Sequence, residues 1–256
     1  MRNAFITGLL VLGLTAPAAA QSDFDQGVAA LASTNAAEVR GGLEQLGLLG
    51  NARAVGPISE RIRRGLPGDL LGVAVDTLMI LGRPQAGPVL FELMNHRRAD
   101  IRLKAVQAIV ACEPRGAEGI LAEGLSDMDP AVRGASAEGL GATGARRSVD
   151  ALFHAMERRV PEAAMAIAQV ARAADVDRFL ETLGRVPFEG VTAALSEMLH
   201  RADLAASAKL SIVHRLTELA TPEVRQFLED LVSNADPNVP PNVLRAAQDA
   251  IPRIGQ

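Results

Sequence analysis

The residues able to do acid–base or metal chemistry are few and scattered along the 256-residue chain. None of the four histidines stands four residues from another, and none is followed directly by Glu. A zinc or iron site needs three or four ligands that converge. We therefore expect surface or interface histidines and no metal site. The four are His96, His154, His200 and His214.

The chain has one cysteine, Cys112, which excludes an intrachain disulfide and a cysteine-rich metal site. A thiol becomes nucleophilic when a neighbouring base or cation lowers its pKa, and the sequence places no histidine near this one. Free cysteine otherwise packs as a small apolar residue. We expect Cys112 to be buried or half-buried, and we predict no catalytic residue.

Gly139, Gly141 and Gly144 match the G-x-G-x-x-G pattern of dinucleotide-binding loops. That pattern binds a dinucleotide only where a strand precedes it and a helix follows it. Here the flanking residues have helical periodicity on both sides. We therefore expect Gly141 and Gly144 to let the chain turn, and we predict no cofactor.

Arginine is the remaining candidate for recognition chemistry, since only two of the 26 basic residues are lysines. Its guanidinium pairs with carboxylates and phosphates through a planar fork, so an acidic protein segment would be a suitable ligand. Cations at helix C-termini are also favoured by the helix dipole alone, which leaves a purely structural role open. The candidate partner-binding residues are Arg61, Arg63, Arg64, Arg97, Arg98, Arg158 and Arg159.

A repeat of 31 residues defines the elements that must position these arginines. Each of four apolar columns recurs three times in the same register, and neither helix of a unit can bury its apolar stripe alone. Successive units must therefore stack, about 8–10 Å apart, which would align the arginine clusters into an interrupted basic ridge. Glu60, Glu92 and Glu157 lie close enough in sequence to neutralise it. The columns are Leu70, Ile101 and Val132; Leu78, Ile109 and Leu140; Leu90, Leu121 and Leu152; and Met94, Leu125 and Met156.

Helical spacing of apolar residues, with no alternating pattern of period two, predicts an all-α protein. In the clearest unit we expect Asp129 to cap a helix, Pro130 to occupy its first position and Ala145 to begin the second helix. Beyond Leu183 the register is lost while paired helices persist. We predict a lead-in helix over 23–32, capped by Ser22, and seven antiparallel helix pairs. These cover about 35–64, 67–97, 98–128, 129–159, 160–186, 187–219 and 221–252.

The segments Asp129–Arg133, Leu140-Gly141 and Gly144, together with Ile101-Arg102, resemble the short bacterial HEAT repeats, also called phycobilisome-lyase-like HEAT repeats. The resemblance covers residues 35–183 well and the rest loosely. It implies a right-handed α-solenoid, a curved stack whose second helices line a concave surface that holds other proteins. Cys112 and Pro114 depart from the repeat's usual residues, so we expect a different turn there.

The composition of the chain excludes one further class of function. Hydrophobic residues make up 48% of the chain, enough for a sizeable core, and the formal charge is −4. A net negative chain without Trp or Tyr is not a general nucleic-acid binder and lacks the aromatic surface used to stack bases.

The N-terminus has the pattern of a secretory signal peptide over residues 1–20. Arg2 precedes an apolar run over 4–14, Pro17 is expected to break the helix, and Ala18–Ala20 form a small-residue cleavage site before Gln21. The run is shorter than the roughly 20 apolar residues of a membrane span. We expect one domain over 21–256, without a transmembrane segment, in the periplasm or secreted.

These observations favour an exported, non-enzymatic scaffold that binds a protein or peptide on its concave face, an acidic segment being one candidate partner. Two alternatives stay open. The family's lyase name implies a lyase or isomerase acting on a bound prosthetic group, although no convergent acid or base is visible. A self-associating structural spacer is the other, because the sequence does not define the oligomeric state.

Overall fold

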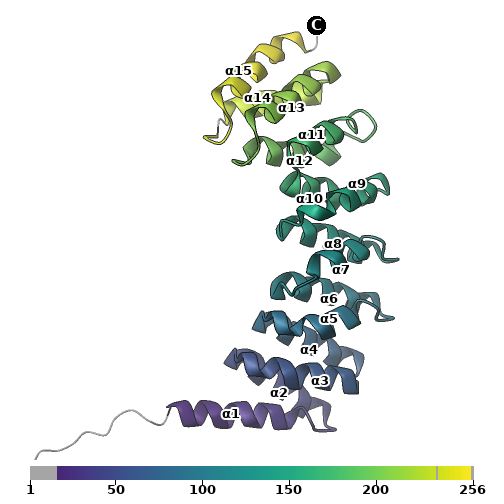
Figure 1. Ribbon diagram of the computed structural model, residues 1–256, viewed down its shortest axis with the longest axis vertical. Coiled ribbons are helices and arrows are strands. Elements are labelled where there is room, and N and C mark those ends of the chain that lie inside the picture. The colour runs from purple at the N-terminus through teal and green to yellow at the C-terminus, as the bar shows by residue number, and fades with distance from the viewer. Residues whose placement is uncertain (1–15, 235, 255–256) are drawn as a thin grey trace, which may run out of the picture.

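The structure, a computed structural model, describes residues 16–234 and 236–254. Within these ranges the chain forms a lead-in helix, α1 (Ala16–Ala30), and seven antiparallel helix pairs stacked into a column (Figure 1). The predicted all-α solenoid of about seven pairs is confirmed. The pairs are α2 (Ala36–Leu49) with α3 (Val55–Arg64), α4 (Gly68–Leu81) with α5 (Gly87–Leu93), α6 (Ala99–Cys112) with α7 (Ala117–Gly124), α8 (Pro130–Ala142) with α9 (Val149–Glu157), α10 (Glu162–Val170) with α11 (Ala173–Leu180), α12 (Glu189–His200) with α13 (Ala206–Leu219), and α14 (Pro222–Ser233) with α15 (Pro241–Ala250).

The lead-in helix begins earlier than the sequence pattern predicts. Ser22 lies inside α1 and does not cap it, and Pro17 is its second residue. Proline is tolerated in the first turn, where its missing N–H has no partner, and the alanines that follow are the best helix formers. The helix that Pro17 is expected to break is that of the preceding apolar run, so this expectation stays a prediction. The predicted apolar run over 4–14 lies outside the described residues, among which no helix is long and apolar enough to cross a membrane.

The unit around α8 folds largely as its sequence predicts. The Asp129 side chain accepts a hydrogen bond from the Ala131 N–H, and Pro130 occupies the first helical position. Gly144 adopts a positive φ of 65° after the helix ends. Gly141, however, lies within α8, and Ala145 precedes a short 3₁₀ helix, so α9 begins only at Val149.

Three of the four predicted columns are fully buried in the core, which runs the length of the stack. In the fourth, Leu125 is buried while Met94 and Met156 are half-buried. The turn at Cys112 differs as expected. Glu113 takes a left-handed conformation with φ of 46°, and α7 lacks the 3₁₀ turn that precedes α3, α5 and α9.

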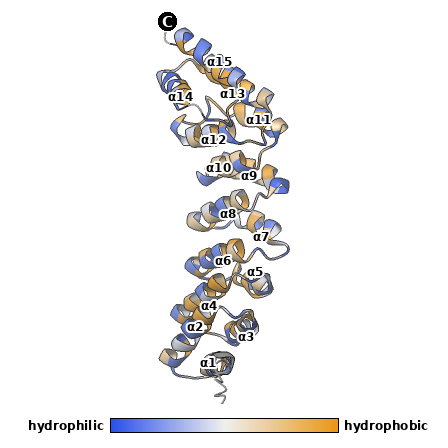
Figure 2. Ribbon diagram, turned by 90° about the vertical axis from the view of Figure 1, so that its left-hand side faces the viewer, coloured by the Kyte–Doolittle hydropathy of each residue, from blue (hydrophilic) through white to orange (hydrophobic). Residues whose placement is uncertain are grey.

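The first helices of the pairs form the tightly packed side of the stack. From α2 to α12 each first helix packs extensively on the next, whereas the second helices touch one another little. Small residues permit this approach, since a Cβ on Gly139 would lie 2.6 Å from the Val110 side chain. In Figure 2 the column is curved, with the first helices on its concave side and the second helices on its convex side. The resemblance implied that the second helices line the concave surface, and this expectation was wrong.

Beyond α11 the main packing between units passes from the first helices to the second helices. α12 still packs on α10, but the continuation of the stack runs through α11, α13 and α15, which are second helices. This change falls where the 31-residue register ends in the sequence, after Leu183. The long connection over 181–188 joins the two parts of the stack.

Candidate partner-binding surface

Antiparallel pairing brings the loops between successive pairs to one edge of the column. We call this surface the loop edge, and it comprises residues 65–67, 94–98, 125–129, 158–161 and 181–188. All seven predicted arginines lie in these loops or in the last turn before them. The prediction that stacking aligns them is supported by contacts that join neighbouring units. Arg63 of the first pair binds Glu92 of the second, and Arg158 of the fourth binds Ser126 of the third.

The arginines at the end of α3 are largely neutralised. Arg63 donates to both carboxylate oxygens of Glu92, with a closest distance of 2.9 Å, and Arg64 pairs with Glu60 at 3.2 Å. Arg61 donates to the Gly65 carbonyl. These three residues therefore fasten the first two pairs and offer little free charge.

Arg98 is engaged as well. Its guanidinium pairs with Asp100 at 2.6 Å and covers Gly68, where a Cβ would collide with it. The hydrogen bond from Arg98 lowers the pKa of Asp100. Arg98 thus anchors the start of α6 against the start of α4.

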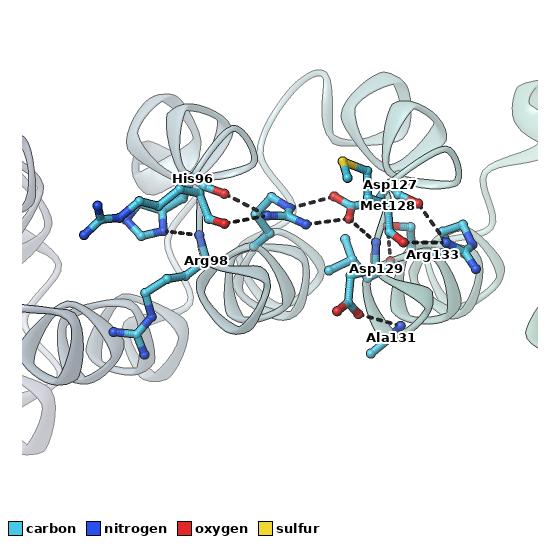
Figure 3. A network of polar contacts seen from close by, with 11 residues as sticks. His96, Arg98, Asp127, Met128, Asp129, Ala131 and Arg133 are labelled. Atoms are coloured by element: carbon cyan, nitrogen blue, oxygen red, sulfur yellow. Dashed lines mark hydrogen bonds and ion pairs between the residues drawn. The ribbon is translucent and has the colours of Figure 1, made fainter.

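A more buried network holds the next two loops, as Figure 3 shows. Arg102 donates from Nη2 and Nε to Asp127, both at 2.7 Å, and from Nη1 to the His96 carbonyl at 2.8 Å. Both side chains of this ion pair are mostly buried, at 14% and 11% exposure. The Arg102 hydrogen bonds hold the pKa of Asp127 below its usual range. Arg133 donates to the Asp127 carbonyl at 2.9 Å.

This network presents two residues outward. Met128, which stands beside Asp127 in Figure 3, is 94% exposed. Arg97 is exposed and pairs with no carboxylate of the described residues, and the same holds for Arg159. These three residues stand 31 apart in the sequence and lie in three successive loops of the edge, although Arg159, two residues after the end of α9, differs in adopting a positive φ of 62°.

An apolar groove adjoins Arg159 at the change of packing row. A cavity of about 400 Å³ lies between the start of α10 and the start of α12, and Arg185 shares its rim with Arg159. No acidic side chain lines it. Its apolar wall comprises Met156, Val160, Pro161, Ala164, Val186, Pro187 and Val191.

A second cavity of about 370 Å³ continues this groove along α11 and shares Met156, Arg159, Arg185 and Val186 with the first. Arg178 also lines this second cavity, but its charge is already paired. Its guanidinium lies 2.6 Å from Asp150 and 4.0 Å from the centre of the Phe153 ring. The carboxylates of the second cavity include Glu157, which faces His154 at 3.2 Å rather than an arginine. The first cavity is therefore the more cationic part of the groove.

Sequence reasoning found Arg97 and Arg159 but missed Arg185 and the exposure of Met128. In the 31-residue repeat Met128 takes the position that Arg97 and Arg159 take in the neighbouring units. Because arginines are normally exposed, this position could have been predicted to lie on the surface. Arg185 follows Leu183, where the 31-residue register ends, so the repeat does not predict its position.

A second apolar patch lies on the tightly packed side. Leu48 of α2 is 90% exposed and Ile80 of α4 is 68% exposed, beside a cavity of about 460 Å³. Glu44 and Asp76 line the same cavity, and Asp76 pairs with Lys104 at 2.5 Å. This patch is acidic where the loop edge is basic.

The described part of the chain holds no group of three His, Cys, Asp or Glu positioned to bind a metal, although Ser196, His200 and Asp230 line one cavity between α12 and α14. Cys112 is buried as expected, its Sγ lies 3.4 Å from the Leu78 carbonyl, and burial raises its thiol pKa. Of the glycines in the G-x-G-x-x-G pattern, Gly139 and Gly141 lie in the last turn of α8 and only Gly144 lies in the turn after it, so a helix rather than a strand precedes the turn.

Three comparisons place this fold among known proteins. The family model for HEAT repeats matches residues 87–172, and no curated protein matches the chain. Among solved structures, a homology model of the full-length AP-3 complex in an intermediate open conformation has a TM-score of 0.55 at 14% identity, covering 93% of this chain and 52% of that one. A crystal structure of an engineered protein has a TM-score of 0.52 at 17% identity, covering 91% and 68%.

The complex of CpcE and CpcF of phycocyanin lyase from Nostoc sp. PCC7120 has a TM-score of 0.49 at 16% identity, covering 99% of this chain and all of that one. At such identities the two likenesses with TM-scores above 0.5 show the fold alone. The match of the repeat model and the stacked helix pairs agree with the 31-residue period. Residues 87–172 thus match HEAT repeats, and the described residues form a HEAT-like α-solenoid.

Proposed function

We propose that the protein is a non-enzymatic scaffold that holds an acidic segment of a partner protein on its loop edge. The observation that carries this proposal is the groove between α10 and α12, where apolar side chains lie beneath two arginines and no carboxylate. Elsewhere on the edge, arginines pair within the chain, so the free cations stand out.

Two features support binding rather than catalysis. The network of Arg102, Asp127 and Arg133 holds the loops in place, and a fixed surface loses less entropy when a partner binds. The first cavity of the groove is lined by no histidine, cysteine or carboxylate that could transfer a proton or attack a substrate. A lyase or isomerase acting on a prosthetic group would need such groups close together.

The site of action in this proposal is outside the cytoplasm, because residues 1–20 have the pattern of a secretory leader. Cleavage after Ala20 would leave residues 21–30 of α1 to cover the first pair. Gln45 donates to the Asp23 carbonyl at 2.8 Å, and Phe24 is buried, so the retained part of α1 has its own anchors.

Affinity capture from the exported fraction of the source cells tests the proposal. The bait is the mature chain, and the test variant carries Arg97→Glu, Arg159→Glu and Arg185→Glu. The control carries Arg83→Glu and Arg115→Glu, which reverse exposed charges in the loops within pairs, on the opposite edge. We expect the test variant to lose an acidic partner that the wild type and control retain. Equal capture by all three would overturn the proposal.

A further inference from the structure

We infer that the groove between α10 and α12 receives the carboxyl terminus of the partner's acidic segment. The side chain of an apolar last residue enters the cavity, and its terminal carboxylate pairs with Arg159 and Arg185. This inference rests on the proposed function and names the part of the partner that binds. The evidence is that both arginines line the same cavity as the apolar wall, and that Arg159 stands where the fold favours glycine.

The charged and apolar parts of the site share one cavity of about 400 Å³. Arg159 and Arg185 are exposed and line it without any carboxylate beside them. In an extended chain neighbouring side chains point to opposite faces, so an acidic residue next to an apolar one would not enter the cavity with it. A last residue carries its carboxylate and its side chain on one Cα, so both reach the same cavity. Two guanidinium groups can bind the two carboxylate oxygens through their planar forks.

The backbone of Arg159 is the second line of evidence. α9 ends in a Schellman motif, in which the Val160 N–H donates to the Ala155 carbonyl at 3.0 Å. The Arg159 N–H donates to the Met156 carbonyl at 2.9 Å. The residue at this place in the motif is left-handed and is usually glycine, because a Cβ is disfavoured there. Arg159 takes the place with a φ of 62°.

The end of α8 has the same motif with the usual residue. The Ala145 N–H donates to the Leu140 carbonyl at 2.9 Å, and Gly144 takes the left-handed place with a φ of 65°. The bond from this loop to the preceding one comes from Arg158, which donates to Ser126 at 3.0 Å, so the Arg159 side chain is not needed for it. Strain without a structural role is expected where the side chain binds a ligand.

The rest of the groove suits a peptide rather than an acyl chain. The second cavity, of about 370 Å³, continues along α11 and is lined by Glu157, Glu181 and Thr182. These polar side chains can accept hydrogen bonds from peptide N–H groups, whereas an acyl chain would desolvate them and leave them unpaired. The last residue of the ligand therefore occupies the first cavity, and the residues before it occupy the second.

Fluorescence anisotropy with three peptides on the mature chain tests which carboxylate binds. Each peptide has a fluorophore at its N-terminus, Ser and Gly in its body and Leu at its last position. The first ends in a free carboxylate and the second in an amide. The third ends in an amide and carries one Glu two residues before Leu, which restores the charge of the first. We expect the first to bind at least about tenfold more tightly than the others, a difference of about 1.4 kcal/mol.

Arg159→Gly separates binding from folding. Glycine relieves the left-handed strain, so we expect the midpoint of thermal unfolding to rise by about 2 °C while the first peptide binds at least about tenfold more weakly. Glu113→Gly is the matched control, because Glu113 is also exposed, has a φ of 46° and lies in a loop on the opposite edge. It should raise the midpoint and leave binding unchanged. A lower midpoint for Arg159→Gly would show that this side chain supports the fold, against the inference.

The outcomes distinguish this inference from the proposed function. If the first and third peptides bind equally and Arg159→Glu with Arg185→Glu weakens both, the groove binds carboxylates of any origin, and the inference fails while the scaffold proposal stands. If no peptide binds, or if that double reversal changes nothing, the groove is not the binding surface and both fail. Decanoate that competes better than the unlabelled first peptide would identify a site for acyl carboxylates and overturn the inference.

Discussion

At the scale of single residues, the structure contains one buried charge that the sequence pattern did not predict. Lys209, on α13, is 1% exposed, and its Nζ donates to the Asn238 carbonyl at 2.7 Å. Desolvation lowers its pKa, and nearby Asp203 and Asp236 only partly oppose this effect. A lysine in a polar-looking stretch is normally exposed, so only the packed structure could reveal it.

Lys209→Met tests this burial. Because the folded-state pKa lies below the ordinary 10.5, the unfolded chain binds more protons as the pH approaches that value, and wild-type stability rises with pH there. We expect the variant to be at least as stable as the wild type at neutral pH and to lack this alkaline rise. Urea unfolding of both chains from neutral to alkaline pH measures the difference. Parallel pH profiles would show that Lys209 is not desolvated.

Asp127→Ala tests the buried network at the loop edge. Removing this carboxylate leaves Arg102 mostly buried without its partner, and we expect a cost of about 3 kcal/mol in the free energy of unfolding. Asp100→Ala is the matched control, because it removes the carboxylate of an exposed pair with Arg98 and should change stability little. Equal losses in urea unfolding would contradict the difference in burial.

The sequence predicted core residues better than it predicted charge partners. Leu78, Ile109 and Leu140 recur at a fixed period and are all buried, because the stack repeats one packing environment. Glu60 and Glu92 were predicted to neutralise arginines and do so, while Glu157 faces His154 instead. Pairing depends on side-chain direction at a loop, which a linear spacing does not determine.

At the scale of elements, the close approach of α1 to α2 depends on one glycine. A Cβ on Gly42 would lie 2.7 Å from the Ala30 Cβ and 2.8 Å from the Gly27 carbonyl, and neither atom can rotate away. A Cβ on the adjacent Gly41 would meet nothing within 4 Å. The helix register therefore places two neighbouring glycines in opposite environments.

We expect Gly42→Ala to destabilise the protein by about 2 kcal/mol, because it forces α1 away from α2. Gly41→Ala should instead stabilise it by up to about 1 kcal/mol, because alanine is the better helix former at an exposed position. Thermal unfolding of the two variants measures both effects. If both substitutions stabilise the protein, α1 does not pack on α2 as described.

Helix boundaries were predictable where a capping residue or a proline marks them, as at Asp129 and Pro130. The predicted boundaries were wrong where a glycine has a role other than ending a helix. Gly141 was assigned to the turn, but it lies within α8, where a Cβ would come within 3.0 Å of Ala166 on α10. A glycine that permits close helix packing and one that ends a helix have the same sequence signature.

At the scale of the whole molecule, residues 1–20 make the export proposal directly testable. We expect the protein recovered from the exported fraction to begin at Gln21, or at pyroglutamate formed from it, because Ala18–Ala20 match a small-residue cleavage site. Intact-mass spectrometry measures this end. Exported protein that keeps residues 4–14 would contradict cleavage at this position.

The stack was predictable from the 31-residue period, but the groove was not. It forms where packing passes from first helices to second helices, between α10 and α12, and there the period no longer applies. Leu48 and Ile80 present a rival apolar surface on the tightly packed side, with Glu44 and Asp76 beside it. The central claim is that the partner binds the loop edge rather than this patch.

Site-specific cross-linking decides between the two surfaces. The sole native thiol, Cys112, is buried, so Met128→Cys and Leu48→Cys can each be labelled alone with a cysteine-reactive photo-cross-linker. Both positions are almost fully exposed, which makes them matched sites on different surfaces. After photolysis with a synthetic peptide that carries both acidic and apolar residues, we expect cross-linked product from position 128 and little from position 48. Product from position 48 alone would contradict binding at the loop edge.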